Sequence, residues 1–145
     1  MNIRTKDNLV VIVAGIGMLL STLDTGIINV ALPFFKSYFE TTADIAAIAV
    51  TGYTISLAVF ILPFGLLSDK FGKLSFSYIG LIIFGLSSLL CGLSANIQML
   101  IMFRIFQGIG AAALQATSAS LITTLVSAEK SSSAIGVLGI MIGVG

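Results

Sequence analysis

The chain has 145 residues, of which 57% are hydrophobic and only 9% are charged, and its net charge is +1. A soluble domain has about 25% charged residues, so this composition excludes a soluble globular protein and predicts an integral membrane protein. No basic patch exists that would bind nucleic acid. With no histidine and Cys91 as the only cysteine, we expect no metal site, disulfide or cofactor, and we do not expect an enzyme.

Charged and turn residues divide the chain into five apolar runs, each of which we expect to be a membrane-spanning helix. A hydrocarbon core of about 30 Å needs roughly 20 apolar residues per helix. The first run is too long for a cleaved signal peptide and contains Asp24. The expected spans are residues 9–33, 45–67, 74–93, 97–126 and 133–145, the last of them cut short.

Basic residues predict which ends of these helices face the cytoplasm, where Lys and Arg are enriched. Lys36 alone falls on one side, in an expected polar loop over residues 35–44 that also contains Glu40. A six-residue turn over 68–73 is expected on the other side. That side holds Arg4, Lys6, Lys70, Lys73 and Lys130. The bias predicts a multi-pass protein with a cytoplasmic N-terminus, in a plasma membrane of bacterial type.

One acid and one base lie deep within these spans. Asp24 is 15 residues beyond Leu9, which places it about 22 Å from the inner face at 1.5 Å per residue. Arg104 is seven residues into the fourth span, about 20 Å above the same face. Each charge alone costs at least about 2.5–3.5 kcal/mol to insert, so we expect the two to pair. A static ion pair that fixes helix packing is the alternative to a functional pair.

Polar residues recur at helical spacing on the same two spans. Two such stripes predict a hydrated central cavity, with hydrogen bonds between helices as the alternative. The first stripe is Thr22, Thr25 and Asn29, and the second is Arg104, Gln107, Ala111, Gln115 and Ser118. Small residues every four positions beside the second stripe predict close helix packing. They are Gly108, Ala112, Ala116 and Ser120.

Three motifs resemble those of the major facilitator superfamily. "GLLSDKFGK", residues 65–73, is similar to its signature loop, Gly-x-Leu-Ala-Asp-Arg-x-Gly-Arg. "LIMFRIFQGIGAAAL", residues 100–114, resembles the fourth-span motif of proton-coupled members, Arg-x-x-Gln-Gly-x-Gly-Ala. "LDTGIINVALP", residues 23–33, resembles the first-span motif of drug:proton antiporters, most closely the fourteen-span branch. The chain departs from that branch at Ala116, where proline is usual, and it lacks a complete fifth-span antiporter motif.

The resemblance implies an all-α bundle of the major facilitator type, of which this chain would supply the first five helices. It implies export of amphipathic organic compounds in exchange for protons, the proton being the coupling ion. Asp24 and Arg104 are then the expected proton-coupling pair. The expected substrate cavity comprises Thr25, Asn29, Gln107, Gly108, Ala111 and Gln115. The expected gating loop comprises Gly65, Asp69, Lys70, Gly72 and Lys73.

Two other functions are compatible with the sequence. One is a carrier of the same superfamily for another small solute, and the other is a membrane scaffold or assembly subunit that transports nothing. The fifth span has about 13 apolar residues after Ser132, fewer than the roughly 20 needed to cross. We therefore expect that the chain cannot transport alone and that a C-terminal half completes the carrier.

Overall fold

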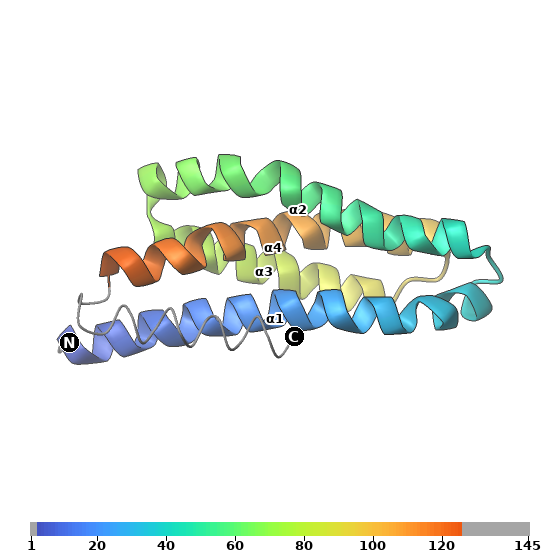
Figure 1. Cartoon of the computed structure of the whole chain (residues 1–145), viewed down its shortest axis with the longest axis horizontal. Coiled ribbons are helices and arrows are strands. Elements are labelled where there is room, and N and C mark those ends of the chain that lie inside the picture. Colours follow the sequence, from blue (N-terminus) through green and yellow to red (C-terminus); the bar gives the residue numbers. More distant parts are fainter. Residues whose placement is uncertain (1–2, 126–145) are drawn as a thin grey trace.

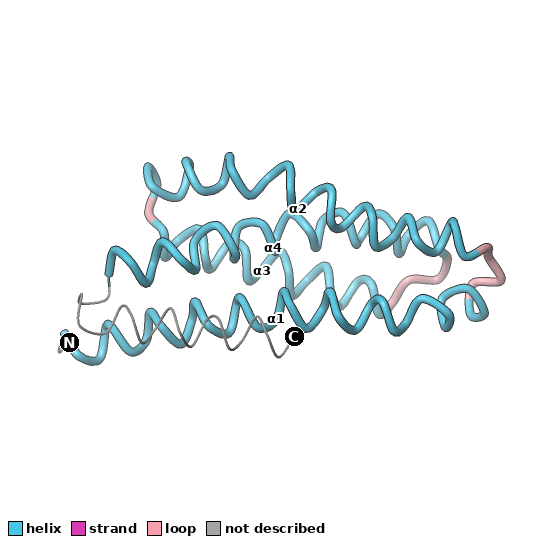
Figure 2. Tube along the Cα trace, viewed as in Figure 1, coloured by secondary structure: helices cyan, strands magenta, loops and turns pink. Residues whose placement is uncertain are grey.

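The computed structural model describes residues 3–125, which form four long helices. In chain order they are α1 (Ile3–Tyr38), α2 (Ala43–Phe71), α3 (Lys73–Gly92) and α4 (Ile97–Leu125). They lie lengthwise beside one another, and α4 packs against each of the other three (Figure 1). The connections lie only at the two ends of the bundle (Figure 2). The predicted fifth span and Lys130 fall outside the described residues.

The all-helical fold is confirmed for this part of the chain. Each of the four helices is long and apolar enough to cross a membrane. A helix satisfies its backbone hydrogen bonds internally, as hydrocarbon requires. Large apolar side chains cover the outside of the bundle, with Val30, Leu62 and Leu93 each more than 70% exposed. This surface suits lipid or further apolar helices rather than water.

The predicted polar loop over residues 35–44 is mostly helical instead. α1 continues through Pro33 to Tyr38, and α2 begins at Ala43, so only residues 39–42 connect them. Proline removes one backbone donor without ending the helix here. The Ser37 hydroxyl donates to the Pro33 carbonyl at 3.3 Å. At the start of α2, Thr42 caps the helix by accepting a hydrogen bond from the Ile45 amide.

The predicted six-residue turn over 68–73 is also wrong. α2 runs to Phe71 and α3 begins at Lys73, so Gly72 is the single residue between them. Its φ of 102° lies in a region that residues with a Cβ rarely adopt and that glycine tolerates. The Gly72 amide donates to the Ser68 carbonyl at 3.0 Å and closes the end of α2.

Glycines let α4 approach its neighbours closely. A Cβ on Gly108 would collide with the Ser56 hydroxyl and the Tyr53 carbonyl of α2. A Cβ on Gly110 would lie 2.6 Å from the Phe84 amide nitrogen of α3. The predicted close packing at Gly108 is therefore confirmed. Gly65 of α2 makes no such contact, because no described atom lies within 4 Å of the position that its Cβ would take.

Candidate functional site

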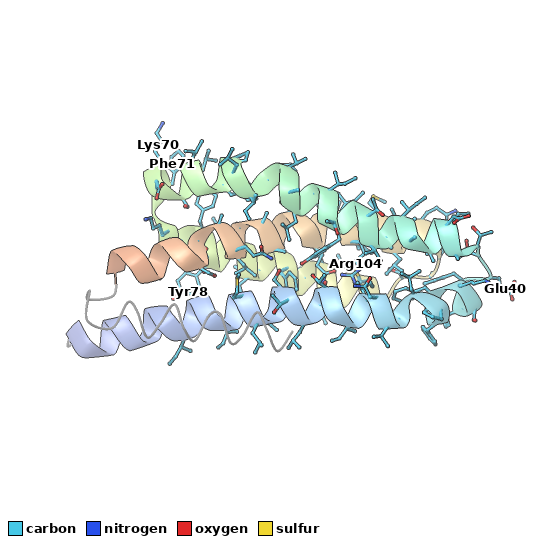
Figure 3. All side chains as sticks on the ribbon, in the orientation of Figure 1. Glu40, Lys70, Phe71, Tyr78 and Arg104 are labelled. Atoms are coloured by element: carbon cyan, nitrogen blue, oxygen red, sulfur yellow. The ribbon has the colours of Figure 1, made fainter. Side chains whose placement is uncertain are left out.

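Asp24 of α1 and Arg104 of α4 form an ion pair inside the bundle. Arg104 Nη1 donates to Asp24 Oδ2 at 2.6 Å, and the two side chains are 4% and 20% exposed respectively. Figure 3 shows Arg104 between the helices, far from both ends. The pairing predicted from their depths is confirmed. A buried pair avoids the cost that either charge would have alone in hydrocarbon.

Gln107, one turn after Arg104, completes a closed triangle with the pair. Its Oε1 accepts from Arg104 Nη1 at 2.7 Å, and its Nε2 donates to Asp24 Oδ1 at 3.0 Å. Both carboxylate oxygens of Asp24 are thus held by α4. Arg104 Nε is buried and has no hydrogen-bond partner among the described residues. The guanidinium therefore keeps an unused donor beside the pair.

A group of uncharged polar side chains, which we call the neutral layer, adjoins this charged triangle and comprises Ser21, Gln115 and Tyr53. Ser21, one turn before Asp24, accepts from Gln115 Nε2 of α4 at 2.8 Å. Its hydroxyl oxygen also lies 3.1 Å from the phenol oxygen of Tyr53 on α2. The Tyr53 ring lies against the charged triangle as well, with Arg104 Cζ 5.4 Å from its centroid. Hydrogen bonds between helices, the alternative reading of the polar stripes, are therefore present.

Tyr53 and Ser21 are members of the site that sequence reasoning missed. A signal for Tyr53 exists, because a tyrosine in an apolar span needs a partner for its hydroxyl. Cys91 of α3 also reaches the triangle, with its Sγ 3.7 Å from Gln107 Oε1.

The expected cavity residues differ in their exposure. Thr25 and Asn29 are exposed on α1, and their side chains donate to carbonyls of their own helix. Gly108 and Ala111 are buried in contacts of α4, whereas Gln115 is half-buried. That these residues line a substrate cavity stays a prediction.

The expected gating residues lie at the far end of the bundle from Glu40, where Figure 3 labels Lys70 and Phe71. Asp69 Oδ1 lies 3.1 Å from Lys73 Nζ, so this ion pair bridges the α2–α3 junction. Lys70 Nζ lies 5.6 Å from the centroid of the Phe71 ring. A hollow of about 350 Å³ opens here, lined by Ser68, Asp69, Gly72, Lys73, Leu74 and Ser75.

The triangle links two helices through opposite charges. Asp24 lies on α1, whereas Arg104 and Gln107 lie on α4. The ion pair therefore depends on how α1 and α4 are placed against each other.

Comparison with known proteins identifies the family of the chain. Residues 14–145 match the family model described as Major Facilitator Superfamily. The chain is 36% identical to the riboflavin transporter RibZ of Clostridioides difficile, over 94% of this chain and 30% of that protein. It is 39% identical to the methylenomycin A resistance protein of Bacillus subtilis, over 78% of this chain and 24% of that protein.

A third relative is the multidrug resistance protein Stp of Mycobacterium tuberculosis, 36% identical over 89% of this chain and 24% of that protein. The chain thus spans between about a quarter and a third of the length of these curated relatives. Its four helices are long and apolar enough to cross a membrane, and its sequence matches the family model and these relatives. The chain therefore belongs to the Major Facilitator Superfamily of membrane transporters.

Proposed function

We propose that this protein is part of a proton-coupled exporter of amphipathic organic compounds in a plasma membrane of bacterial type. The N-terminus and the α2–α3 junction face the cytoplasm, and a second helical bundle completes the carrier. The basic-residue bias supports this orientation. The greater length of the relatives supports the second bundle. The names of two relatives, a methylenomycin resistance protein and a multidrug resistance protein, support the substrate class.

The observation that carries the proposal is the buried triangle of Asp24, Arg104 and Gln107. When Asp24 takes up a proton, its ion pair with Arg104 is lost and α1 is held less firmly to α4. When the proton leaves, the pair forms again. A proton therefore changes the balance between two arrangements of the helices, which is what coupling requires.

We further propose that the segment from Gly65 to Lys73 latches the cytoplasmic side. The Asp69–Lys73 pair holds the single-residue junction between α2 and α3. Asp69 is 61% exposed in this pair, which leaves one side of its carboxylate free to meet a further helix end or basic group. Such a contact would have to break for the carrier to open inward.

A second candidate function is export or import of a flavin-like solute. The similarity to the riboflavin transporter RibZ favours it, because that relative matches 94% of this chain. Riboflavin and a cationic dye differ in charge, so one assay separates the two candidates. A scaffold without transport activity would move neither.

The decisive experiment measures flux in proteoliposomes that contain the full-length protein as the cell makes it. Uptake of ethidium and of riboflavin is followed with and without an imposed pH gradient. Asp24→Asn should abolish gradient-driven flux while leaving membrane insertion intact. Asp44→Asn is the matched control, because it makes the same chemical change at an exposed position in the first turn of α2.

Saturable, gradient-dependent dye flux that is lost in Asp24→Asn and kept in Asp44→Asn supports the proposal. Riboflavin flux without dye flux would favour the second candidate. If Asp24→Asn retains undiminished gradient-driven flux, the ion pair is structural and Asp24 is not the proton site. Absence of flux for both solutes in the folded protein would favour the scaffold.

A further inference from the structure

We infer that Tyr53 of α2 positions Arg104 for its ion pair with Asp24 and thereby sets the pH at which Asp24 takes up a proton. This inference rests on the proposed role of Asp24. Tyr53 is a positioning residue that acts through Arg104 and contacts neither the proton nor the substrate. Its side chain contacts both Arg104 of the charged triangle and Ser21 of the neutral layer.

Tyr53 is fixed at three points. Its side chain is buried, with 3% of its surface exposed. At its backbone, the carbonyl accepts a hydrogen bond from the Ser56 hydroxyl at 2.9 Å and lies against Gly108 of α4. At its tip, the phenol oxygen is 3.1 Å from the Ser21 hydroxyl of α1. The ring between these points has little freedom to move.

The fixed ring forms one wall of the space that holds the guanidinium. Arg104 Cζ lies 5.4 Å from the ring centroid, within the range of a cation–π contact. Among the described residues, the hydrogen bonds of Arg104 are those of Nη1 to Asp24 and to Gln107, and its Nε has no partner there. With so few polar contacts, the orientation of the guanidinium depends on the surface against which it packs.

Removal of the ring would let the guanidinium turn away from Asp24. A carboxylate that loses its nearby cation binds a proton more readily. Asp24 should then become protonated at a higher pH. A neighbouring guanidinium favours the carboxylate by about 1–3 pH units, so partial loss of this contact should change the midpoint by about one pH unit.

The other ionisable groups near Asp24 do not obscure this change. Those facing it in the described structure are Arg104 on α4, Tyr53 on α2 and Cys91 on α3. A phenol and a thiol ordinarily titrate near about 10 and 8.5, above the range of a carboxylate. Arginine keeps its charge throughout. A titration in the acid and neutral range therefore reports on Asp24.

The test is an infrared titration of the full-length protein in lipid. A protonated carboxyl group has a C=O stretching band that a carboxylate lacks, and the band missing in Asp24→Asn is assigned to Asp24. Its midpoint is then measured in Tyr53→Leu and Tyr53→Met, which lose the ring, and in Tyr53→Phe, which keeps it. Ser21→Ala is the control, because it removes the hydroxyl that lies 3.1 Å from the phenol oxygen and leaves the ring in place, with the phenol still able to donate to the Ser21 carbonyl at 3.4 Å.

The midpoint should rise by about one pH unit in Tyr53→Leu or Tyr53→Met and stay within a few tenths of a unit in Tyr53→Phe and Ser21→Ala. An unchanged midpoint in a folded variant without the ring would overturn the inference. So would an equal shift in Tyr53→Phe, a variant that keeps nearly the whole volume of the side chain. Flux is not used here, so a transporter without proton coupling would refute the proposed function and leave this result standing.

Discussion

Replacing Gly108 with alanine tests the contact that seats α4 against α2. The added methyl group would collide with the Ser56 hydroxyl and the Tyr53 carbonyl, and its distance to the Tyr53 carbonyl carbon would be 3.2 Å, below the ordinary contact range of 3.4–4 Å. Backbone atoms cannot turn aside as the end of a side chain can. The two helices must therefore separate locally, and overpacking of this kind costs about 1–3 kcal/mol.

The same substitution also stabilises the helix itself, and this contribution must be separated from the cost of the collision. Alanine is favoured over glycine within a helix by about 0.5–1 kcal/mol. Gly85→Ala is the matched control, since Gly85 lies within α3, is exposed, and has no described atom within 4 Å of its would-be Cβ. Both variants gain the same helix propensity, and only Gly108→Ala introduces the collision with α2. The difference in Tm between the two variants isolates the packing contribution.

We expect Gly108→Ala to melt below the parent and Gly85→Ala at or above it, with a gap of roughly 6 °C for a loss of about 2 kcal/mol. The assay is thermal unfolding of the purified protein in detergent, followed by the fraction that remains monodisperse in size-exclusion chromatography. If Gly108→Ala is as stable as Gly85→Ala, the helices are not in contact at this position and the reasoning fails.

Three further predictions concern the site and the topology. Arg104→Lys should lower gradient-driven flux at least tenfold, because an ammonium group lacks the planar face and the fork of donors that meet Tyr53 and Asp24; flux equal to the parent would contradict this. A cysteine placed at Glu40 should react only with an impermeant reagent added from outside, and one at Lys70 only from inside; the reverse result would overturn the orientation. Asp69→Asn should shift the balance of inward- and outward-open states, and unchanged accessibility of cavity cysteines from both sides would rule out the latch.

The sequence predicted the ion pair because depth along a helix follows from counting residues. Asp24 and Arg104 lie at one level whichever faces of their helices meet, and hydrocarbon leaves few other partners for them. Counting cannot predict which side of α2 points inward. Tyr53 was missed for that reason, since its role depends on the rotation of α2 about its axis.

The helix ends were predicted less well than the pair. The polar residues after Pro33 predict a loop, but polar residues beyond the apolar core can continue a helix into the interface. The junction at Gly72 shows the same effect, because Asp69 and Lys70 are charged and still helical. A change in polarity marks where the membrane ends and does not mark where the helix ends.

The separation of Asp24 and Arg104 along the chain sets the order in which the bundle is assembled. The two residues are 80 positions apart, and ribosomes add about 5–20 residues per second. Asp24 therefore emerges roughly 4–16 s before its partner, and α1 enters the bilayer with an acid that α4 has not yet met. Protonation or contact with water must hold that helix in place during the interval, at a cost of at least about 2.5 kcal/mol. The interval ends when Arg104 is synthesised, so the ion pair can form only after α2 and α3 have been made.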